Sequence, residues 1–332
     1  PEVVLGRGGF AVDTAPEGSL VAVPDGDGGW VVGATPAEAR LSAGRVQGRR
    51  TTAGAVPPLE APDGDWEAVL RTPWVEPAYL ETDAAWCEPG GRPCSPLANG
   101  GAFGAKLESV APAAARELAD EHGRPVLVVL SREDTVRMGA KRPPVSGGAR
   151  ADGTGVLRVV RTPGIVEAVA AVAPGLVVEE VDVAGPPTSS SIRAAGWAEA
   201  VVLLTGAGAM DGPVVSPDGA SATAAVGDDG ISVTVRCGDP LDATVLRSYC
   251  VGAAHMAWSW ITSEALSVDG DGTVHDLTVR SFGVVRATDT PTISVVIEDD
   301  DGEPVNGSDA VFAAVAAATW CHRGRPHELP TG

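Results

Sequence analysis

The chain has 332 residues, 44% of them apolar and 20% charged, which is the composition of an ordinary globular protein with two or three domains. Its net charge of −20 excludes nucleic acids and anionic membranes as expected partners, because an acidic surface repels both. No apolar run reaches the roughly 18 residues of a transmembrane helix. A basic segment followed by an apolar core is not seen at the start, so we expect no signal peptide and a cytoplasmic location.

The five cysteines are scattered, and none belongs to a C-x-x-C pair. This spacing argues against a zinc ribbon or an iron–sulfur cluster on this chain. The odd count predicts reduced thiols, with a disulfide between Cys87 and Cys94 as the alternative. The five histidines share no metal-ligand spacing, so we expect no metal bound by side chains.

The first unit, residues 1–60, alternates short apolar runs with glycine and aspartate turns. Strands are expected at 20–23 and 30–33, and a helix over 37–46. Residues 51–65 are rich in proline and glycine and are expected to form a linker.

The second unit, residues 61–150, is expected to contain two strands within 66–85. A helix over 111–122 and a strand over 125–130 should follow. Residues 135–155 are expected to be loop-like, because they contain a Pro-Pro and a Gly-Gly pair.

The third unit, residues 151–332, alternates strands with helices, which favours an α+β or mixed α/β fold of several small layers. Strands are expected at 156–160, 176–183, 231–235 and 292–297. Helices are expected at 165–172, 190–204, 242–263 and 310–320.

Residues 100–106 form the most informative motif, Gly-Gly-Ala-Phe-Gly-Ala-Lys. Glycines permit a positive φ and let the backbone approach a ligand closely, and successive N–H groups in such a loop can bind an anion. A nucleotide P-loop is excluded because Leu107, which has no hydroxyl, follows Lys106. A dinucleotide fingerprint is excluded because no strand precedes the loop. A tight turn between two elements is the simpler alternative.

This motif resembles the Gly-Gly-x-Phe-Gly-x-Lys loop of the molybdenum hydroxylases, the family of xanthine dehydrogenase, aldehyde oxidase and carbon monoxide dehydrogenase large subunits. Four further segments resemble that family in the same order, namely 79–85, 130–143, 189–193 and 252–291. The resemblance implies a shortened molybdopterin-binding subunit. Residues 1–60 would be the remnant of the N-terminal α/β domain, and 61–150 and 151–332 would be the two molybdopterin-binding-like domains.

The resemblance also implies which residues bind a molybdenum–molybdopterin cofactor, without any protein ligand on the metal. Two loops would contribute the contacts: Gly100, Gly101, Phe103 and Gly104 in the first, and Ser189, Ser190, Ser191 and Arg193 in the second. Electrons would pass to iron–sulfur and flavin groups on partner subunits, because this chain has no motif for either. The substrate would be a small molecule.

The family's catalytic base is a glutamate that lies just before the last helix, in a Gly-Glu-Pro sequence. Glu303 occupies that sequence here, and Asp309 is the runner-up; a solvated Glu303 without a catalytic role is the alternative. A useful base needs a pKa raised by burial. Glu264 and Arg132 also match family positions, and we expect both to form structural pairs.

Two of the family's cofactor contacts are missing. Thr162-Pro163-Gly164 stands where a Gly-Gln-Gly loop is expected, and no Phe-Arg-Gly occurs between 142 and 156. Two functions therefore remain open. One is an oxidoreductase subunit that hydroxylates a purine, an aldehyde or an N-heterocycle; the other is a cofactor-free relative that acts as a binding or assembly protein.

Overall fold

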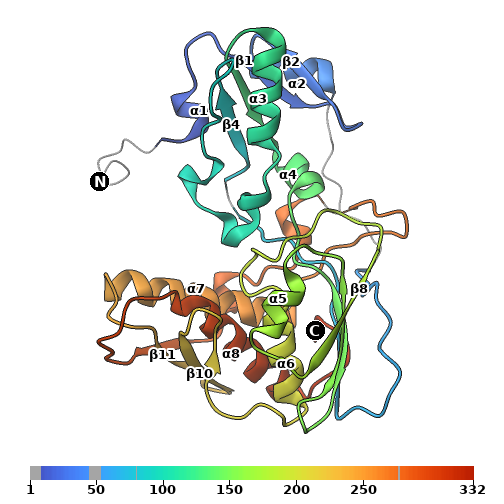
Figure 1. Ribbon diagram of the computed structural model, residues 1–332, viewed down its shortest axis with the longest axis vertical. Helices are drawn as coiled ribbons and strands as arrows, with labels where there is room; N and C mark the ends of the chain where they lie inside the picture. Colours follow the sequence, from blue (N-terminus) through green and yellow to red (C-terminus); the bar gives the residue numbers. More distant parts are fainter. Residues whose placement is uncertain (1–8, 45–53, 80, 276) are drawn as a thin grey trace.

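The computed structural model describes residues 9–44, 54–79, 81–275 and 277–332. The described chain forms two lobes, which are stacked vertically in Figure 1. It contains three four-stranded sheets, one in the upper lobe and two in the lower. The mixed α/β character expected from the sequence is confirmed. No described helix is both long enough and apolar enough to cross a membrane.

The upper lobe is built on a sheet with the strand order β2-β1-β5-β4. Its strands are β1 (Leu20–Pro24), β2 (Trp30–Gly33), β4 (Ala84–Cys87) and β5 (Val126–Val129). Only β1 and β5 run parallel to each other. Its helices are α1 (Ala11–Thr14), α2 (Pro36–Ala43) and α3 (Ala111–His122). The part of the expected 37–46 helix beyond residue 44 lies outside the described residues, as do residues 51–53 of the expected linker.

Helix α3 covers one face of this sheet. It has a proline in its first turn and ends at Gly123, whose φ of 61° is left-handed. Ala111, Ala115 and Leu118 recur at helical spacing on one face and are buried against the sheet. The helix bounds match those expected from the sequence.

The second sheet has the order β3-β6-β7-β8. Its strands are β3 (Ala68–Arg71), β6 (Val145–Ala149), β7 (Gly155–Val160) and β8 (Leu176–Val181). Helices α5 (Ile165–Ala170) and α6 (Trp197–Gly206) pack near it. Strands β6 and β7 pair across residue 150, and the first sheet joins strands from both sides of residue 60. The domain boundaries at these residues remain predictions.

The expectation of a loop over 135–155 was wrong. Most of α4 (Arg132–Met138) and all of β6 lie in that stretch. A capping box between Ser131 and Asp134 begins the helix. In β6 the glycine pair lies inside the strand and does not interrupt it. A Cβ at Gly148 would lie 2.5 Å from the Trp66 ring. The glycine is therefore needed for close packing inside a strand.

The third sheet has the order β12-β11-β10-β9. Its strands are β9 (Val214–Val215), β10 (Ser221–Gly227), β11 (Gly230–Arg236) and β12 (Ile293–Ile297). Helices α7 (Ala243–Thr262) and α8 (Gly307–His322) lie beside it. Short 3-10 segments complete the described chain: η1 (Pro96–Asn99), η2 (Ala102–Glu108), η3 (Val279–Ser281) and η4 (Ala287–Asp289).

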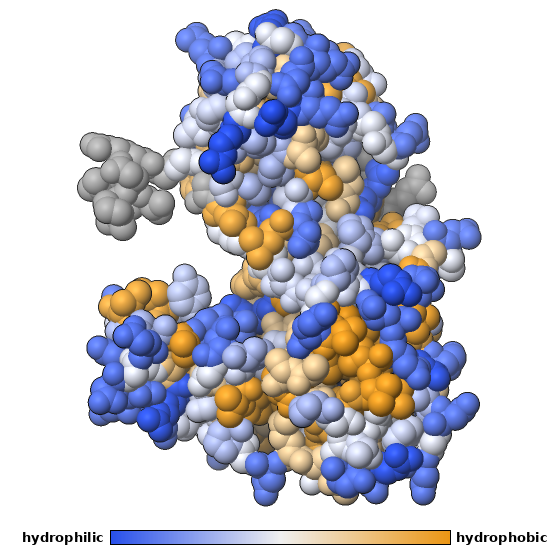
Figure 2. Space-filling view, viewed as in Figure 1, coloured by the Kyte–Doolittle hydropathy of each residue, from blue (hydrophilic) through white to orange (hydrophobic). Residues whose placement is uncertain are grey.

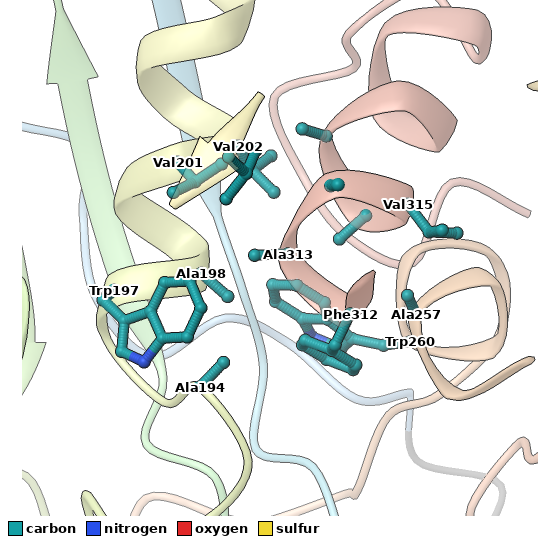
Figure 3. Close-up of a cluster of buried hydrophobic side chains, with 14 of the residues drawn as sticks. Ala194, Trp197, Ala198, Val201, Val202, Ala257, Trp260, Phe312, Ala313 and Val315 are labelled. Carbon is teal, nitrogen blue, oxygen red and sulfur yellow. The ribbon is translucent and has the colours of Figure 1, made fainter. Parts of the chain in front are cut away.

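Helices α6, α7 and α8 meet in the core of the lower lobe. Small side chains, such as Ala198, Ala257 and Ala313, let the three helices approach closely (Figure 3). Trp260 of α7 stacks on Phe312 of α8, with ring centroids 5.4 Å apart. Both rings belong to the buried core of this lobe.

Helix α6 begins later than the sequence predicts. Residues 190–196 form a loop that contains Ala194 and Gly196, both with a positive φ. A Cβ at Gly196 would lie 2.5 Å from the Ile165 side chain, so the glycine lets the chain turn tightly against α5. The loop brings residues 189–193 toward η2 in the upper lobe.

Candidate functional site

The two loops expected to bind a cofactor are in direct contact. In η2, Phe103 and Gly104 have left-handed φ values of 56° and 101°. A Cβ added at Gly104 would lie 1.7 Å from the carbonyl oxygen of Ser191. The backbone N–H of Arg193 donates a hydrogen bond to the carbonyl of Phe103 at 2.8 Å. The glycine is thus required where the second loop touches the first.

An outer groove of about 660 Å³ lies beside this contact. Its main lining residues come from η2 and its flanks, from the second loop and from α7: Gly100, Gly101, Phe103, Gly104, Lys106, Arg193, Tyr249 and Gly252. Figure 2 shows the surface hollowed between the two lobes. The volume lies within the roughly 300–1,000 Å³ typical of small-molecule and cofactor sites.

An inner cavity of about 220 Å³ shares Ala78, Phe103 and Arg193 with the outer groove. The Arg193 guanidinium lies over the Phe103 ring, 5.1 Å from its centroid. Apolar side chains form most of the wall: Val75, Ile192, Met256, Trp260, Val284 and Phe312. The two spaces therefore meet at this cation–π pair and at Ala78.

Arg142 forms the polar floor of the cavity and is held in place from several sides. Its guanidinium makes two hydrogen bonds with Glu199, of 2.6 and 2.9 Å, and donates to the carbonyl of Arg193 at 2.7 Å. It also lies over the rings of Trp260 and Phe312, at 4.3 and 4.9 Å from their centroids. Arg142 and Glu199 are 5% and 0% exposed, so this is a buried ion pair.

The remaining charged groups of the wall differ in how they are neutralised. Glu76 lies 2.9 Å from the ammonium of Lys141, and Arg193 lies 3.3 Å from Asp309. Glu264 also lines the cavity but has no cationic partner within 4.0 Å among residues 9–44, 54–79, 81–275 and 277–332. Burial raises its pKa to about 7, against the opposing effects of the Ser259 hydroxyl and of Arg142.

The raised pKa of Glu264 makes the free energy of unfolding depend on pH. The folded state favours the protonated Glu264 carboxyl. The contribution of this carboxyl to stability is therefore complete below its pKa in the unfolded chain, about 4.3, and is lost as the pH rises through 7. Glu264→Gln should remove a pH-dependent difference of about 1–3 kcal/mol between pH 5 and pH 8. Urea denaturation of both proteins across that range measures it, and parallel curves would contradict the assignment.

The structure brings some of the expected cofactor residues to the outer groove and leaves others outside it. Gly100, Gly101, Phe103, Gly104 and Arg193 all line the outer groove. The three serines of the second loop do not line it, and two of their hydroxyls make hydrogen bonds within the protein.

The hydroxyl of Ser189 accepts a hydrogen bond from the N–H of Ser191 at 3.0 Å. The hydroxyl of Ser190 donates to the carbonyl of Pro163 at 2.7 Å. Ser191 is exposed, and its carbonyl faces Gly104. The second loop thus contacts the first through its backbone.

Of the two candidate bases, Asp309 lies nearer to the site. It is in the first turn of α8 and pairs with Arg193, and Ser308 beside it accepts a hydrogen bond from the same guanidinium at 3.3 Å. Glu303 is exposed in the segment before α8 and lies outside the lining of both spaces, with its backbone against Gly238. Its role as a base stays a prediction.

The sequence analysis missed the central role of Arg142 and its partner Glu199. Arg142 belongs to a segment that carried the family resemblance, which was a usable signal. Glu199 lies in an otherwise apolar helix, α6, and a lone acid in such a helix is a sign of a buried pair. Arg132, the other expected structural residue, donates a hydrogen bond to the carbonyl of Tyr79.

Within the part of the chain that the structure describes, no group of three or more His, Cys, Asp or Glu side chains could hold a metal ion. All five cysteines are free thiols in the structure, so Cys87 and Cys94 do not form a disulfide there.

Comparison with known proteins supports the fold. No family model and no curated protein matches the sequence. Among solved structures, quinoline 2-oxidoreductase from Pseudomonas putida 86 has a TM-score of 0.54 and 9% identity, over 99% of this chain and 95% of that chain. The chain shares this fold, and the neighbour is a molybdenum hydroxylase.

Two further structures match over smaller regions. CO dehydrogenase from Oligotropha carboxidovorans has 10% identity and a TM-score of 0.28, over 55% of this chain and 35% of that chain. Aldehyde oxidoreductase from Desulfovibrio gigas has 14% identity and a TM-score of 0.28, over 58% and 35%.

Proposed function

We propose that the chain is a subunit of a molybdenum hydroxylase-type oxidoreductase, with a molybdenum–molybdopterin group in the outer groove and a small-molecule substrate in the inner cavity. One observation carries this proposal: Phe103 and Arg193 line both spaces. A group held in the groove would therefore meet a molecule held in the cavity. Positioning two reactants side by side is a large part of what an enzyme contributes.

The groove residues fit such a group. Gly100 and Gly101 have open space where a Cβ would stand, so their backbone is accessible to a ligand. Arg193 and Lys106 line the groove, beside the acidic side chain of Glu81. Arg193 already pairs with Asp309, at 3.3 Å. Gly100, Gly101, Phe103, Gly104 and Arg193 would hold the cofactor, which would supply two-electron oxidation chemistry when bound.

The protein would add a general base near the shared pair. Asp309 is the candidate that the geometry favours, because its partner Arg193 faces both spaces. Glu303 is the candidate that the family resemblance favours. The proposal includes separate iron–sulfur and flavin subunits as electron acceptors.

The first test is the molybdenum and pterin content of the full chain, purified from cells that make the cofactor. We expect close to one molybdenum per chain by mass spectrometry and a matching pterin signal by fluorescence. No molybdenum under these conditions would overturn the proposal. In loaded protein, loss of the base should lower kcat by about 10²–10⁴, so comparing Asp309→Asn with Glu303→Gln assigns it.

One observation favours the second function, a cofactor-free binding or assembly protein. The Ser190 hydroxyl bonds to Pro163, in the segment that replaces the family's Gly-Gln-Gly loop. The Ser190 hydroxyl is thereby satisfied without a cofactor. A molybdenum-free protein that still binds small molecules in the inner cavity would support this alternative.

A further inference from the structure

Lysine is rare in this chain, although positive charge is not. The sequence has 22 arginines and only two lysines, Lys106 and Lys141. A guanidinium stays protonated in proteins, whereas the amine of a lysine can lose its proton and then act as a nucleophile. In a chain that otherwise uses arginine for positive charge, a lysine at a groove indicates a role for the amine itself.

The two lysines differ in what they can meet. Lys141 is 0% exposed, and its ammonium lies 2.9 Å from Glu76 and donates a hydrogen bond to the carbonyl of Gly139 at 2.5 Å. Lys106 is also buried, at 2% exposed, but its side chain lines the outer groove. Lys141 lies outside the lining of that groove, so a molecule held there meets Lys106.

The surroundings of Lys106 define its position and disfavour its charge. Its nitrogen lies 5.4 Å from the centroid of the Tyr79 ring, and the Tyr79 hydroxyl donates a hydrogen bond to Asp83 at 2.9 Å. Burial lowers the pKa of the Lys106 amine. The carboxylates of Asp83 and Glu81 oppose this effect, and Arg132 strengthens it. More of this amine is therefore neutral, and so nucleophilic, than the amine of a solvent-exposed lysine.

We infer that Lys106 is a nucleophile that forms an imine with a small aldehyde or ketone bound in the outer groove. The neutral amine nitrogen attacks the carbonyl carbon, and the π electrons of the C=O bond move to the oxygen, which takes up a proton. The resulting carbinolamine then loses water, so that a C=N bond replaces the C=O bond. Both hydrogens of the amine leave with the carbonyl oxygen, and no oxidant or reductant is consumed.

Glu81 is placed to carry the proton in this step. It lines the same groove, it is exposed to solvent, and its charge acts on the Lys106 amine. Its carboxylate can accept a proton from the attacking nitrogen and return it to the departing hydroxyl group. The groove thus holds both a nucleophile and a general acid–base.

This inference goes beyond the proposed function and does not rest on it, because the amine belongs to the chain itself. A cofactor held in the outer groove would compete with the carbonyl compound for the same space. The test therefore uses the full chain purified from cells that do not make the molybdenum cofactor.

The test is reductive trapping with benzaldehyde and cyanoborohydride at pH 7, followed by peptide mass mapping. Cyanoborohydride reduces an imine to a stable amine and leaves one benzyl group on the nitrogen that reacted. We expect the label on Lys106, with a rate that saturates as the benzaldehyde concentration rises. That rate should be at least about tenfold above the rate of Nα-acetyllysine in the same solution, because the groove holds the carbonyl beside the amine. Lys141 should stay unlabelled.

Variants assign the two roles. Lys106→Met should abolish the label, and Glu81→Gln should slow its formation at least about tenfold. Glu108→Gln is the matched control, because Glu108 is an exposed carboxylate on η2 that does not line the groove. It should leave the rate unchanged. Thermal unfolding of each variant shows whether it is folded, and the mapping of the unsubstituted chain needs no variant.

A label on the α-amine or on Lys141 without one on Lys106 would overturn the inference. A Lys106 rate equal to that of Nα-acetyllysine would also overturn it, because an ordinary accessible amine reacts at that rate. An unchanged rate in Glu81→Gln would overturn the proton transfer assigned to Glu81. A chain that never contains molybdenum but is labelled on Lys106 refutes the proposed function and keeps this inference. A chain that takes up molybdenum, but whose cofactor-free form is not labelled, does the reverse.

Discussion

Glu199→Gln is expected to lower the free energy of unfolding by about 3–5 kcal/mol, the cost of breaking one side of a buried ion pair. Glu199 is fully buried in α6 and binds the Arg142 guanidinium through both carboxylate oxygens. Its Oε2 atom also accepts a hydrogen bond from the N–H of Gly196 at 2.8 Å. The substitution removes the charge that compensates Arg142 and leaves that guanidinium buried.

The expected loss is large because Arg142 cannot move into water. The aromatic rings of Trp260 and Phe312 cover it, and the carbonyls of Arg193 and Ala194 accept two further N–H groups. These contacts join the second loop to the core of the lower lobe. A change at Glu199 should therefore also loosen the loop that supports the outer groove.

Chemical denaturation in urea at pH 7 measures the effect. Glu179→Gln is the matched control, because Glu179 pairs with Arg158 at 2.9 Å on the surface, where it is 46% exposed. Exposed pairs contribute about 0–1 kcal/mol, so the control should stay within that range. Similar losses for the two variants would show that burial does not determine the energy of the Arg142 pair.

The sequence predicts most elements of this fold because their periodicity is local. The bounds of α3 match those expected from the sequence, and Asp242 caps α7 where the apolar run begins. Strand β6 was not predicted because its glycines are required by packing against residues that are distant in sequence, Gly147 against Leu203 and Gly148 against Trp66. Glycine has a low strand propensity, and here it is required by packing against distant residues. No local pattern could therefore identify that strand.

The site was predicted in part for the same reason. The glycine loop and Arg193 belong to segments that resemble a family, and the structure brings them together at the outer groove. The surroundings of Glu264 depend on which side chains line one cavity, and those come from separate segments of the chain. Its raised pKa follows from burial, which a sequence does not record.

Gly104→Ala is expected to separate the two loops of the site and to lower the free energy of unfolding by about 2–4 kcal/mol, from backbone strain and a lost hydrogen bond. The φ of Gly104 is 101°, a value that residues with a Cβ rarely adopt. The added Cβ would stand 1.7 Å from the carbonyl oxygen and 2.5 Å from the carbonyl carbon of Ser191. Backbone atoms cannot rotate away as a side chain can, so the second loop must shift.

That shift would break the hydrogen bond from the N–H of Arg193 to the carbonyl of Phe103. It would also move the cation–π pair of Arg193 and Phe103, which lies between the outer groove and the inner cavity. Gly101→Ala is the control, because Gly101 has a φ of −85° and open space around its Cβ position. We expect it to change the free energy of unfolding by less than about 0.5 kcal/mol. Urea denaturation gives both values. A Gly104→Ala protein with unchanged stability would mean that the two loops are not held together by this contact, and the shared boundary between groove and cavity would lose its structural basis.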